Sequence, residues 1–131
     1  MVVVFNSTNG ALTVNGLLIA AGSSSAPIIF TGQNLNWVGI VFTSTAVPAV
    51  FQNDVYQSGC KIEYATIQMA YGYPNGALYL STGVYLNYVN MTQNTYTAIS
   101  INTVADIQFD NVNVVDANTW WGSNTVFITG L

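Results

Sequence analysis

The sequence predicts an all-β protein built as a solenoid of about four to five coils, and three observations support this fold class. One residue pattern occurs three times, in segments 61–69, 85–92 and 106–113. The segments 76–80 and 97–101, which open two coils, recur at a similar distance. No stretch has the apolar period of a capped helix, whereas residues that favour strands are abundant. A repeat of about 20 residues with internal alternation is typical of stacked coils of strands.

The three repeated segments agree position by position. Each has an aliphatic residue, a polar residue, an aromatic ring, two turn-like positions and an apolar residue. The aliphatic residues are Ile62, Leu86 and Ile107, separated by 24 and then 21 residues, and the rings are Tyr64, Tyr88 and Phe109. Equivalent positions of stacked coils lie about 4.8 Å apart. Alternation places the rings on the same side as the aliphatic residues, so an internal aromatic stack is expected. A surface strip for sugar stacking is the alternative interpretation.

The remaining elements follow in chain order. Strands are expected at 1–5, 11–14, 17–20, 28–30, 37–42, 61–69, 76–80, 85–92, 97–101, 106–113 and 125–129, the last as the opening strand of a fifth coil. Asn, Gly and Ser mark the turns between them. Segment 44–59 lacks clean alternation and is predicted to be a long inserted loop. Its length explains why Leu80 follows Phe42 by 38 residues, whereas Ile99 follows Leu78 by 21.

An antiparallel sandwich is the competing architecture. The dipeptides Asn9-Gly10, Asn15-Gly16 and Asn75-Gly76 are typical of hairpin turns. A sandwich, however, gives no reason for strands 21 residues apart to share residue types column by column. A solenoid gives that reason, because like residues stack on like.

Four consecutive segments, 10–20, 27–31, 37–42 and 60–67, resemble right-handed parallel β-helix repeat proteins of the pectate-lyase-like fold, which occur on bacterial and archaeal cell surfaces. The resemblance covers nearly the whole chain. It implies tight two-residue turns, here at 65–66, 89–90 and 110–111, and a stacked ladder of Thr66, Asn90 and Asn111. Asn suits such a ladder because it tolerates left-handed backbone and its amide can bond the Asn one coil away. The resemblance also implies that the chain starts partway along a longer β-helix.

Charged residues are scarce, at 5% of the chain, with one Lys, five acidic residues and neither Arg nor His. Nucleic-acid binding and attachment to an anionic membrane both need clustered basic residues, so neither is expected. No apolar run approaches the roughly 20 residues of a membrane-spanning helix. The single Cys60 excludes an intrachain disulfide and is expected to be a small buried residue. The composition is similar to that of secreted archaeal proteins.

No enzyme activity, cofactor or metal site is expected. Lyases of the resembled fold use an Arg or Lys base with calcium-binding carboxylates, and the related hydrolases use clustered Asp. This chain lacks Arg and His, the usual proton-transfer residues are therefore missing, and Lys61 is expected to be solvated. Asp106 and Asp110 are close in sequence but are expected to face different directions, so a catalytic pair is disfavoured. A calcium site from these two with Asn111 and Asn113 is also disfavoured.

The expected function is that of a structural protein at the cell surface or in an extracellular filament. The alternative is a carbohydrate-binding or carbohydrate-cleaving β-helix, such as a tailspike or a polysaccharide lyase. An ice-binding solenoid would need regular rows of Thr, and Thr43, Thr97 and Thr125 are too scattered for that. Trp120 and Trp121 are candidates for a surface aromatic contact. Asn6 and Asn90 match the N-glycosylation pattern, which makes glycans candidate partners.

Both end segments are apolar and carry no charged or proline residue that would discourage pairing. They contain Val2, Val3, Val4 and Phe5 at one end and Val126, Phe127 and Ile128 at the other. The terminal coils of a β-helix expose unpaired backbone groups unless something covers them. Two arrangements would cover them: head-to-tail stacking of copies, which yields a filament, or continuation into a longer rod.

Overall fold

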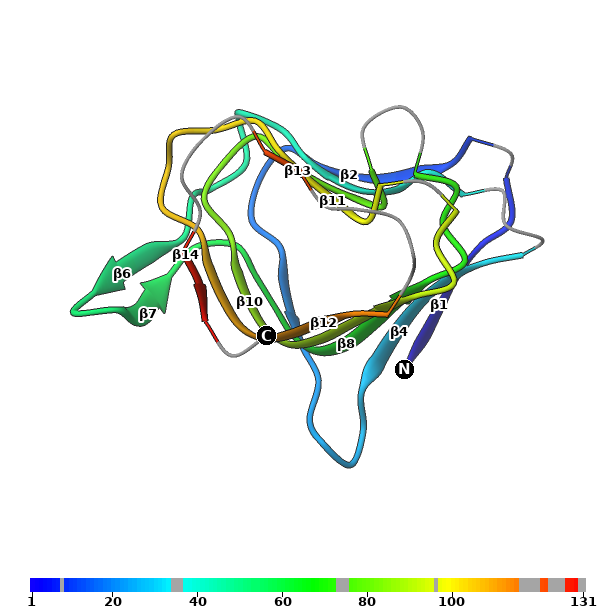
Figure 1. The fold of residues 1–131 in the computed structure, drawn as a ribbon, viewed down its shortest axis with the longest axis horizontal. Coiled ribbons are helices and arrows are strands. Elements are labelled where there is room, and N and C mark those ends of the chain that lie inside the picture. Colours follow the sequence, from blue (N-terminus) through cyan, green and yellow to red (C-terminus); the bar gives the residue numbers. More distant parts are fainter. Residues whose placement is uncertain are drawn as a thin grey trace.

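The structure is a computed structural model that describes residues 1–7, 9–33, 37–72, 76–95 and 97–115, and the backbone of 121–122 and 127–129. These residues form fourteen β-strands and no helix. Hence no helix able to span a membrane is found in the described part of the chain. Most of the strands belong to two parallel sheets, and the chain passes repeatedly from one sheet to the other, as Figure 1 shows. The fold is a parallel β-helix of a few coils.

The larger sheet has seven strands. In spatial order they are β1 (Val2–Phe5), β4 (Ile28–Gly32), β8 (Lys61–Gln68), β10 (Tyr85–Thr92), β12 (Gln108–Val114) and β14 (Phe127–Thr129), with β3 (Ile19–Ala21) also paired to β8. The smaller sheet has five strands, in the order β13 (Trp121–Gly122), β11 (Ile99–Ile101), β9 (Leu78–Leu80), β5 (Gly39–Phe42) and β2 (Ala11–Val14). All pairings within these two sheets are parallel.

The register between coils confirms one predicted step and corrects the other. Leu86 pairs with Ile62, as the 24-residue spacing predicts. Leu86 also pairs with Phe109, so the prediction that it aligns with Ile107 is wrong by two residues. The aligned feature is a residue with left-handed backbone in each long strand: Tyr64 (φ 47°), Tyr88 (φ 52°) and Asn111 (φ 53°). The third repeat therefore matches the first two through Asn111, and Phe109 occupies the aliphatic position.

Apolar side chains in register fill the space between the two sheets. In the larger sheet the columns are Ala20–Ile62–Leu86–Phe109, Ile28–Ala65–Val89–Val112 and Phe30–Ile67–Met91–Val114. In the smaller sheet they are Leu12–Ile40–Leu78–Ile99 and Val14–Phe42–Leu80–Ile101. Most of these side chains are buried, and the others pack against the buried ones. In β8 the inward positions are 62, 65 and 67, because the left-handed residue at 64 resets the alternation.

Segment 44–59 is inserted between β5 and β8, as the sequence predicts, and it has secondary structure of its own. It contains an antiparallel hairpin of β6 (Val50–Gln52) and β7 (Val55–Ser58), which projects from the side of the coil (Figure 1). Its two-residue turn, Asn53-Asp54, has positive φ at both positions, 51° and 62°. That backbone matches the twist of hairpin strands, and Asn and Asp adopt it more readily than other residues with a side chain.

The two ends of the coil also differ from prediction. The fifth coil opens with β13, which pairs with β11, whereas β14 continues the larger sheet beside β12. The prediction that segment 125–129 opens the fifth coil is therefore wrong. At the other end, β3 and β4 together pair with the single strand β8. Between them the chain makes a projecting loop at 22–27, which we call the 22–27 loop (Figure 1). This loop takes the place of the left-handed residue found in later coils.

Candidate functional sites

Aromatic side chains fix the β6–β7 hairpin to the coil. Alternation along the hairpin leaves Phe51 and Tyr56 half-buried, whereas Val50 and Val55 point to solvent. The Tyr56 ring stacks on that of Tyr85 from β10, with ring centroids 5.3 Å apart, and the Phe51 ring meets Tyr85 edge-on at 5.9 Å. Such pairs contribute about 0.5–1.5 kcal/mol each beyond the area they bury.

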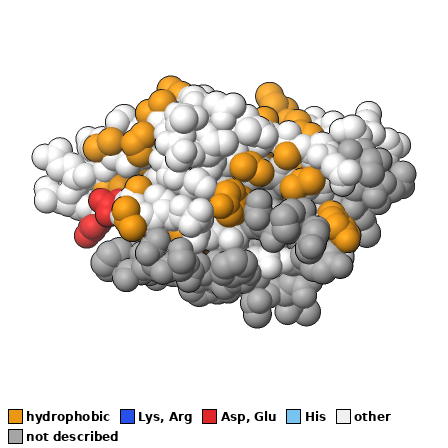
Figure 2. Space-filling model, turned by 90° about the horizontal axis from the view of Figure 1, so that it is seen from above, with side chains coloured by type: hydrophobic (Ala, Val, Ile, Leu, Met, Phe, Trp, Pro, Cys, Tyr) orange, Lys and Arg blue, Asp and Glu red, His pale blue; other side chains and the backbone are white. Residues whose placement is uncertain are grey.

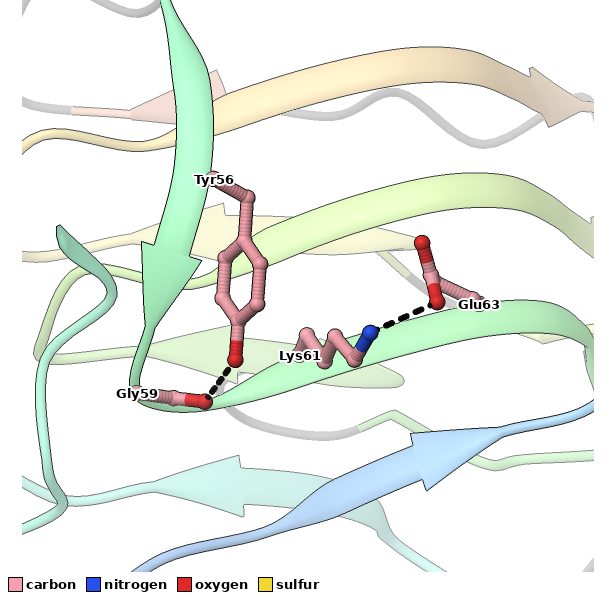
Figure 3. A network of polar contacts seen from close by, with 4 residues as sticks. All are labelled: Tyr56, Gly59, Lys61 and Glu63. Atoms are coloured by element: carbon pink, nitrogen blue, oxygen red, sulfur yellow. Dashed lines mark hydrogen bonds and ion pairs between the residues drawn. The ribbon is translucent and has the colours of Figure 1, made fainter. Parts of the chain in front are cut away.

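An ion pair lies beside these rings. Lys61 Nζ lies 2.8 Å from Glu63 Oε2, and each of the two side chains is 21% exposed (Figure 3). The Lys61 ammonium is also 5.0 Å from the centroid of the Tyr56 ring, and the Tyr56 hydroxyl donates to the Gly59 carbonyl at 2.7 Å. The prediction of a solvated Lys61 is therefore wrong. Residues i and i+2 of a strand share a face, so the two-residue spacing of Lys61 and Glu63 could have predicted this ion pair.

Carboxylates occupy the same side of the molecule. Asp110 accepts from Gln108 Nε2 at 2.7 Å and from the Tyr85 hydroxyl. Asp54, from the turn of the hairpin, and Asp106 line a separate hollow of about 130 Å³. In Figure 2 the visible acidic atoms lie at the hairpin side. Asp106 and Asp110 therefore have different neighbours and do not face each other as a pair. Among the described residues, no group of three acidic or cysteine side chains is placed to hold a metal ion.

Tyr85 gives this cluster a dependence on alkaline pH. Burial, followed by the hydrogen bond to Asp110 and the negative charge of that carboxylate, raises the pKa of Tyr85 to about 12. The unfolded chain loses the proton near pH 10, so the stabilisation is complete below pH 10 and is lost as the pH rises towards 12. We expect the melting temperature to fall over this window. In Tyr85→Phe that fall should be smaller when unfolding is followed by circular dichroism, and an identical fall in both proteins would contradict the assignment.

A groove on another part of the surface lies between the 22–27 loop and the left-handed positions of β8 and β10. It encloses about 410 Å³ and is lined by Ser23, Ser24, Pro27, Tyr64, Ala65, Thr66, Tyr88 and Asn90. The Tyr64 and Tyr88 rings stack face to face, with centroids 4.7 Å apart and planes 8° apart. Tyr88 is 47% exposed, whereas Phe109 is buried in the core. The predicted stack therefore exists for two rings only, and on the outside of the coil.

The left-handed backbone explains why these rings point outward. It breaks the strict alternation that would have placed Tyr64 on the side of Ile62. For a residue with a bulky side chain this conformation costs about 1–2 kcal/mol, and Asn, present at 111, tolerates it better. The turns predicted at 65–66 and 89–90 are one residue too late, because the left-handed residues are Tyr64 and Tyr88, whereas the turn predicted at 110–111 contains the left-handed residue Asn111.

The predicted ladder is correct for one step. Thr66 pairs with Asn90, but Asn90 pairs with Asn113, whose Nδ2 donates to Asn90 Oδ1 at 3.5 Å. Asn111 instead donates to Asn87 Oδ1 at 3.3 Å, so its place in the predicted ladder is wrong. The side chains of Asn90, Asn111 and Asn113 are exposed.

The buried polar side chains that join coils lie elsewhere. Asn94 is 5% exposed; its Oδ1 accepts from the Ala70 amide at 3.0 Å, and its Nδ2 donates to the Ile67 carbonyl at 3.1 Å. Cys60 is buried as predicted, and its thiol bridges the Leu18 amide and the Gly16 carbonyl, each at 3.4 Å. Sequence reasoning missed Asn94 because it follows the repeated pattern instead of lying within it.

The apolar end segments lie at opposite edges of the larger sheet, in β1 and β14. In β1, Val2 and Val4 are exposed, whereas Val3 and Phe5 pack against the core, and the Phe5 ring stacks on Trp37. Phe127 and Ile128 belong to β14, whose backbone alone is described, and Val126 and Trp120 lie outside the described residues, as does the side chain of Trp121. Asn6 is exposed, as is Asn90, but Thr8 of the first acceptor pattern lies outside the described residues, and glycosylation stays a prediction.

Comparison with protein-family models, with curated proteins and with solved structures finds no match.

Proposed function

We propose that this β-helix is a structural module of the cell surface or of an extracellular filament, and that copies of it join end to end. The proposal places the chain among right-handed β-helix repeat proteins of the pectate-lyase-like type, in line with its stacked parallel sheets and scarce charge. The observation that carries the proposal is that the strands at the two ends of the coil follow matching columns.

Strand β14 at one end of the coil and β3 at the other end occupy the same columns of the larger sheet. The residue pairings place Phe127 in one column with Gln108, Tyr85, Lys61 and, at the far end, Ile19. If the columns continue from one copy to the next, β14 lies beside β3 of the next copy. In the smaller sheet, β13 would lie beside β2 in the same way, because Trp121 occupies the column that ends in Thr13.

Strand β1 would complete the shared coil. It covers only β4, which is the second half of the first coil. At the opposite end, β14 pairs with 108–110 of β12 and not with 112–114. Val3 lies in the column of Phe30, Ile67, Met91 and Val114, so β1 of the next copy would extend an apolar column at the position that β14 does not cover.

Exposed apolar side chains support an association at this end. Met1, Val2, Val4, Leu17 and Ile19 are all more than half exposed. Burying such groups is favourable by roughly 25 cal/mol per Å² of apolar surface. The net charge of only −4 gives little repulsion between copies.

A single charged residue at the open edge should prevent assembly. Val4 is 52% exposed in β1, so Val4→Lys should fold normally. The variant places an ammonium group at the contact between two copies, and lysines on an edge strand discourage pairing. We expect the unmodified chain to form unbranched fibres by electron microscopy and large species by sedimentation, and Val4→Lys to stay monomeric.

The matched control is Val55→Lys. Val55 is 59% exposed on the hairpin, away from both ends, so this variant should still form fibres. A stable monomer of the unmodified chain at high concentration would contradict the proposal. Equal loss of assembly in both lysine variants would show that added charge, not the edge, is responsible.

A further inference from the structure

We propose that the Tyr64–Tyr88 ring pair is a modification site, at which hydrogen peroxide and a haem peroxidase join the two rings by a carbon–carbon bond. The product, a dityrosine, staples β8 to β10 and so fixes two successive coils to each other. The inference does not depend on end-to-end assembly, since both rings belong to one chain and lie on the side of the coil. It rests on the contact between the rings, their access to solvent and the strain of their backbone.

The two rings are placed for coupling. Residues 63 and 65 of β8 pair with 87 and 89 of β10 in parallel register, so Tyr64 and Tyr88 leave the backbone at equivalent points. Their ring centroids are 4.7 Å apart and their planes differ by 8°. Each ring therefore covers one face of the other, and the hydroxyl groups lie at the same end of the stack. The ring carbons beside the hydroxyls, where phenols couple, are thus neighbours.

Solvent reaches the edges of this pair. Tyr88 is 47% exposed and Tyr64 is half-buried, and both line the groove of about 410 Å³ beside the 22–27 loop. Neither hydroxyl has a hydrogen-bond partner among the described residues. Water can therefore take the proton that a phenol loses on oxidation, and no polar contact prevents the rings from turning towards each other.

Tyrosine is strained at both positions. Tyr64 and Tyr88 have left-handed backbone, with φ of 47° and 52°, whereas the equivalent position of the next coil has Asn111, which adopts this backbone more readily. Strained residues commonly mark functional sites. Burial does not explain the rings, because Tyr88 is exposed. Coupling does explain them, since it requires a phenol in each of two adjacent coils.

The reaction balances with hydrogen peroxide as the oxidant. Each tyrosine gives one electron to the haem of the peroxidase, loses its phenolic proton and becomes a phenoxyl radical. The two unpaired electrons form one bond between the ring carbons next to the hydroxyls. Each of these carbons then releases its hydrogen as a proton, while each oxygen regains a proton. The net two electrons and two protons reduce one molecule of hydrogen peroxide to two of water.

Tyr56 and Tyr85 form the rival pair, because their rings also stack, with centroids 5.3 Å apart and planes 19° apart. Coupling requires stacked rings to turn until their edges meet, and these two rings are held in place. The Tyr56 hydroxyl donates to a backbone carbonyl, and the Tyr85 hydroxyl donates to Asp110. The geometry therefore favours the Tyr64–Tyr88 pair.

A bond between these coils should stabilise the fold. The chain has a single cysteine, so a disulfide within one chain cannot join two coils. Residues 64 and 88 lie 24 positions apart, and closing a loop of this length lowers the entropy of the unfolded chain, as a disulfide does. We expect the cross-linked protein to melt about 10 °C higher than the untreated protein.

The test treats dilute folded protein with a haem peroxidase and hydrogen peroxide, then denatures it and digests it with trypsin. The chain has one lysine, Lys61, and no arginine, so trypsin yields fragments 1–61 and 62–131. Tyr64 and Tyr88 both belong to the second fragment, whereas Tyr56 belongs to the first. We expect dityrosine fluorescence and a separate fragment 62–131 that is lighter by two hydrogen atoms in mass spectrometry.

Two variants and one condition serve as controls. Tyr88→Phe keeps the ring but lacks the phenol, so the lighter fragment and the rise in melting temperature should both be absent. Tyr71→Phe removes a phenol that is 39% exposed in the same fragment, and it should react like the unmodified protein. Protein unfolded in urea during the treatment should give little of the lighter fragment, because the fold brings the two rings together.

Four results would overturn the inference: no lighter fragment from the folded protein, equal yields from Tyr88→Phe and the unmodified protein, cross-linked dimers in place of lighter monomers, or fragments 1–61 and 62–131 joined to each other. The last result would place the bond between Tyr56 and Tyr85. An unchanged melting temperature in the cross-linked protein would contradict the stapling role. The same yield from Val4→Lys would separate this site from the assembly proposal.

Discussion

Phe109→Ala is expected to lower the free energy of unfolding by about 3–5 kcal/mol, which is typical of truncating a buried Phe. Phe109 is 1% exposed and lies in register with Leu86, which in turn aligns with Ile62 and Ala20. Alanine would leave a cavity between the sheets, and the coils above and below fix the strand spacing, so the site has little freedom to collapse. Urea unfolding followed by circular dichroism measures the loss.

The matched comparison is Tyr88→Ala. In the register predicted from the sequence, Tyr88 and Phe109 would belong to one internal stack and would contribute similarly. In the structure Tyr88 is exposed, and its loss removes only the ring contact with Tyr64, about 0.5–1.5 kcal/mol. Equal destabilisation by the two variants would contradict the observed register.

The fold was predictable because its main requirement is visible in the sequence. Stacked coils need apolar residues at equivalent positions, and this requirement appears in the sequence as the repeated residue pattern. The register error came from matching aromatic with aromatic. The apolar residue three positions after the aliphatic one distinguishes the alternatives: Ala65 and Val89 match Val112 when Phe109 is the aliphatic position, but match Asp110 when Ile107 is.

The candidate sites were harder to predict because they depend on departures from regular alternation. A single left-handed residue, Tyr64 or Tyr88, turns a ring from the core to the surface, and tyrosine gives no local signal for that backbone. The hairpin could have been predicted from the sequence, since Asn53-Asp54 suits a two-residue turn. The Lys61–Glu63 ion pair could also have been predicted, because the two residues lie two positions apart in one strand. The groove could not, because its other wall is the 22–27 loop, whose position depends on how two strands share β8.

Asn94→Leu is expected to cost about 2–5 kcal/mol, although leucine has a similar volume. The Asn94 side-chain amide forms hydrogen bonds with two backbone groups of the preceding coil, the N–H of Ala70 and the C=O of Ile67. Asn94 itself is only 5% exposed. Leucine can replace neither bond, and each buried backbone group deprived of a partner costs about 1–3 kcal/mol. The effect should appear as a lower urea midpoint with an unchanged slope.

Asn102→Leu is the matched control for Asn94→Leu. Asn102 is exposed, and its Nδ2 donates to the Tyr79 hydroxyl at 3.0 Å, a bond that water can replace. Its substitution should change stability by about 0.5 kcal/mol or less. An equally small loss of stability in both variants would mean that water reaches the polar groups around Asn94. A large loss for Asn94→Leu alone would identify Asn94 as the amide that joins these two coils, in contrast to the exposed Asn90 and Asn111.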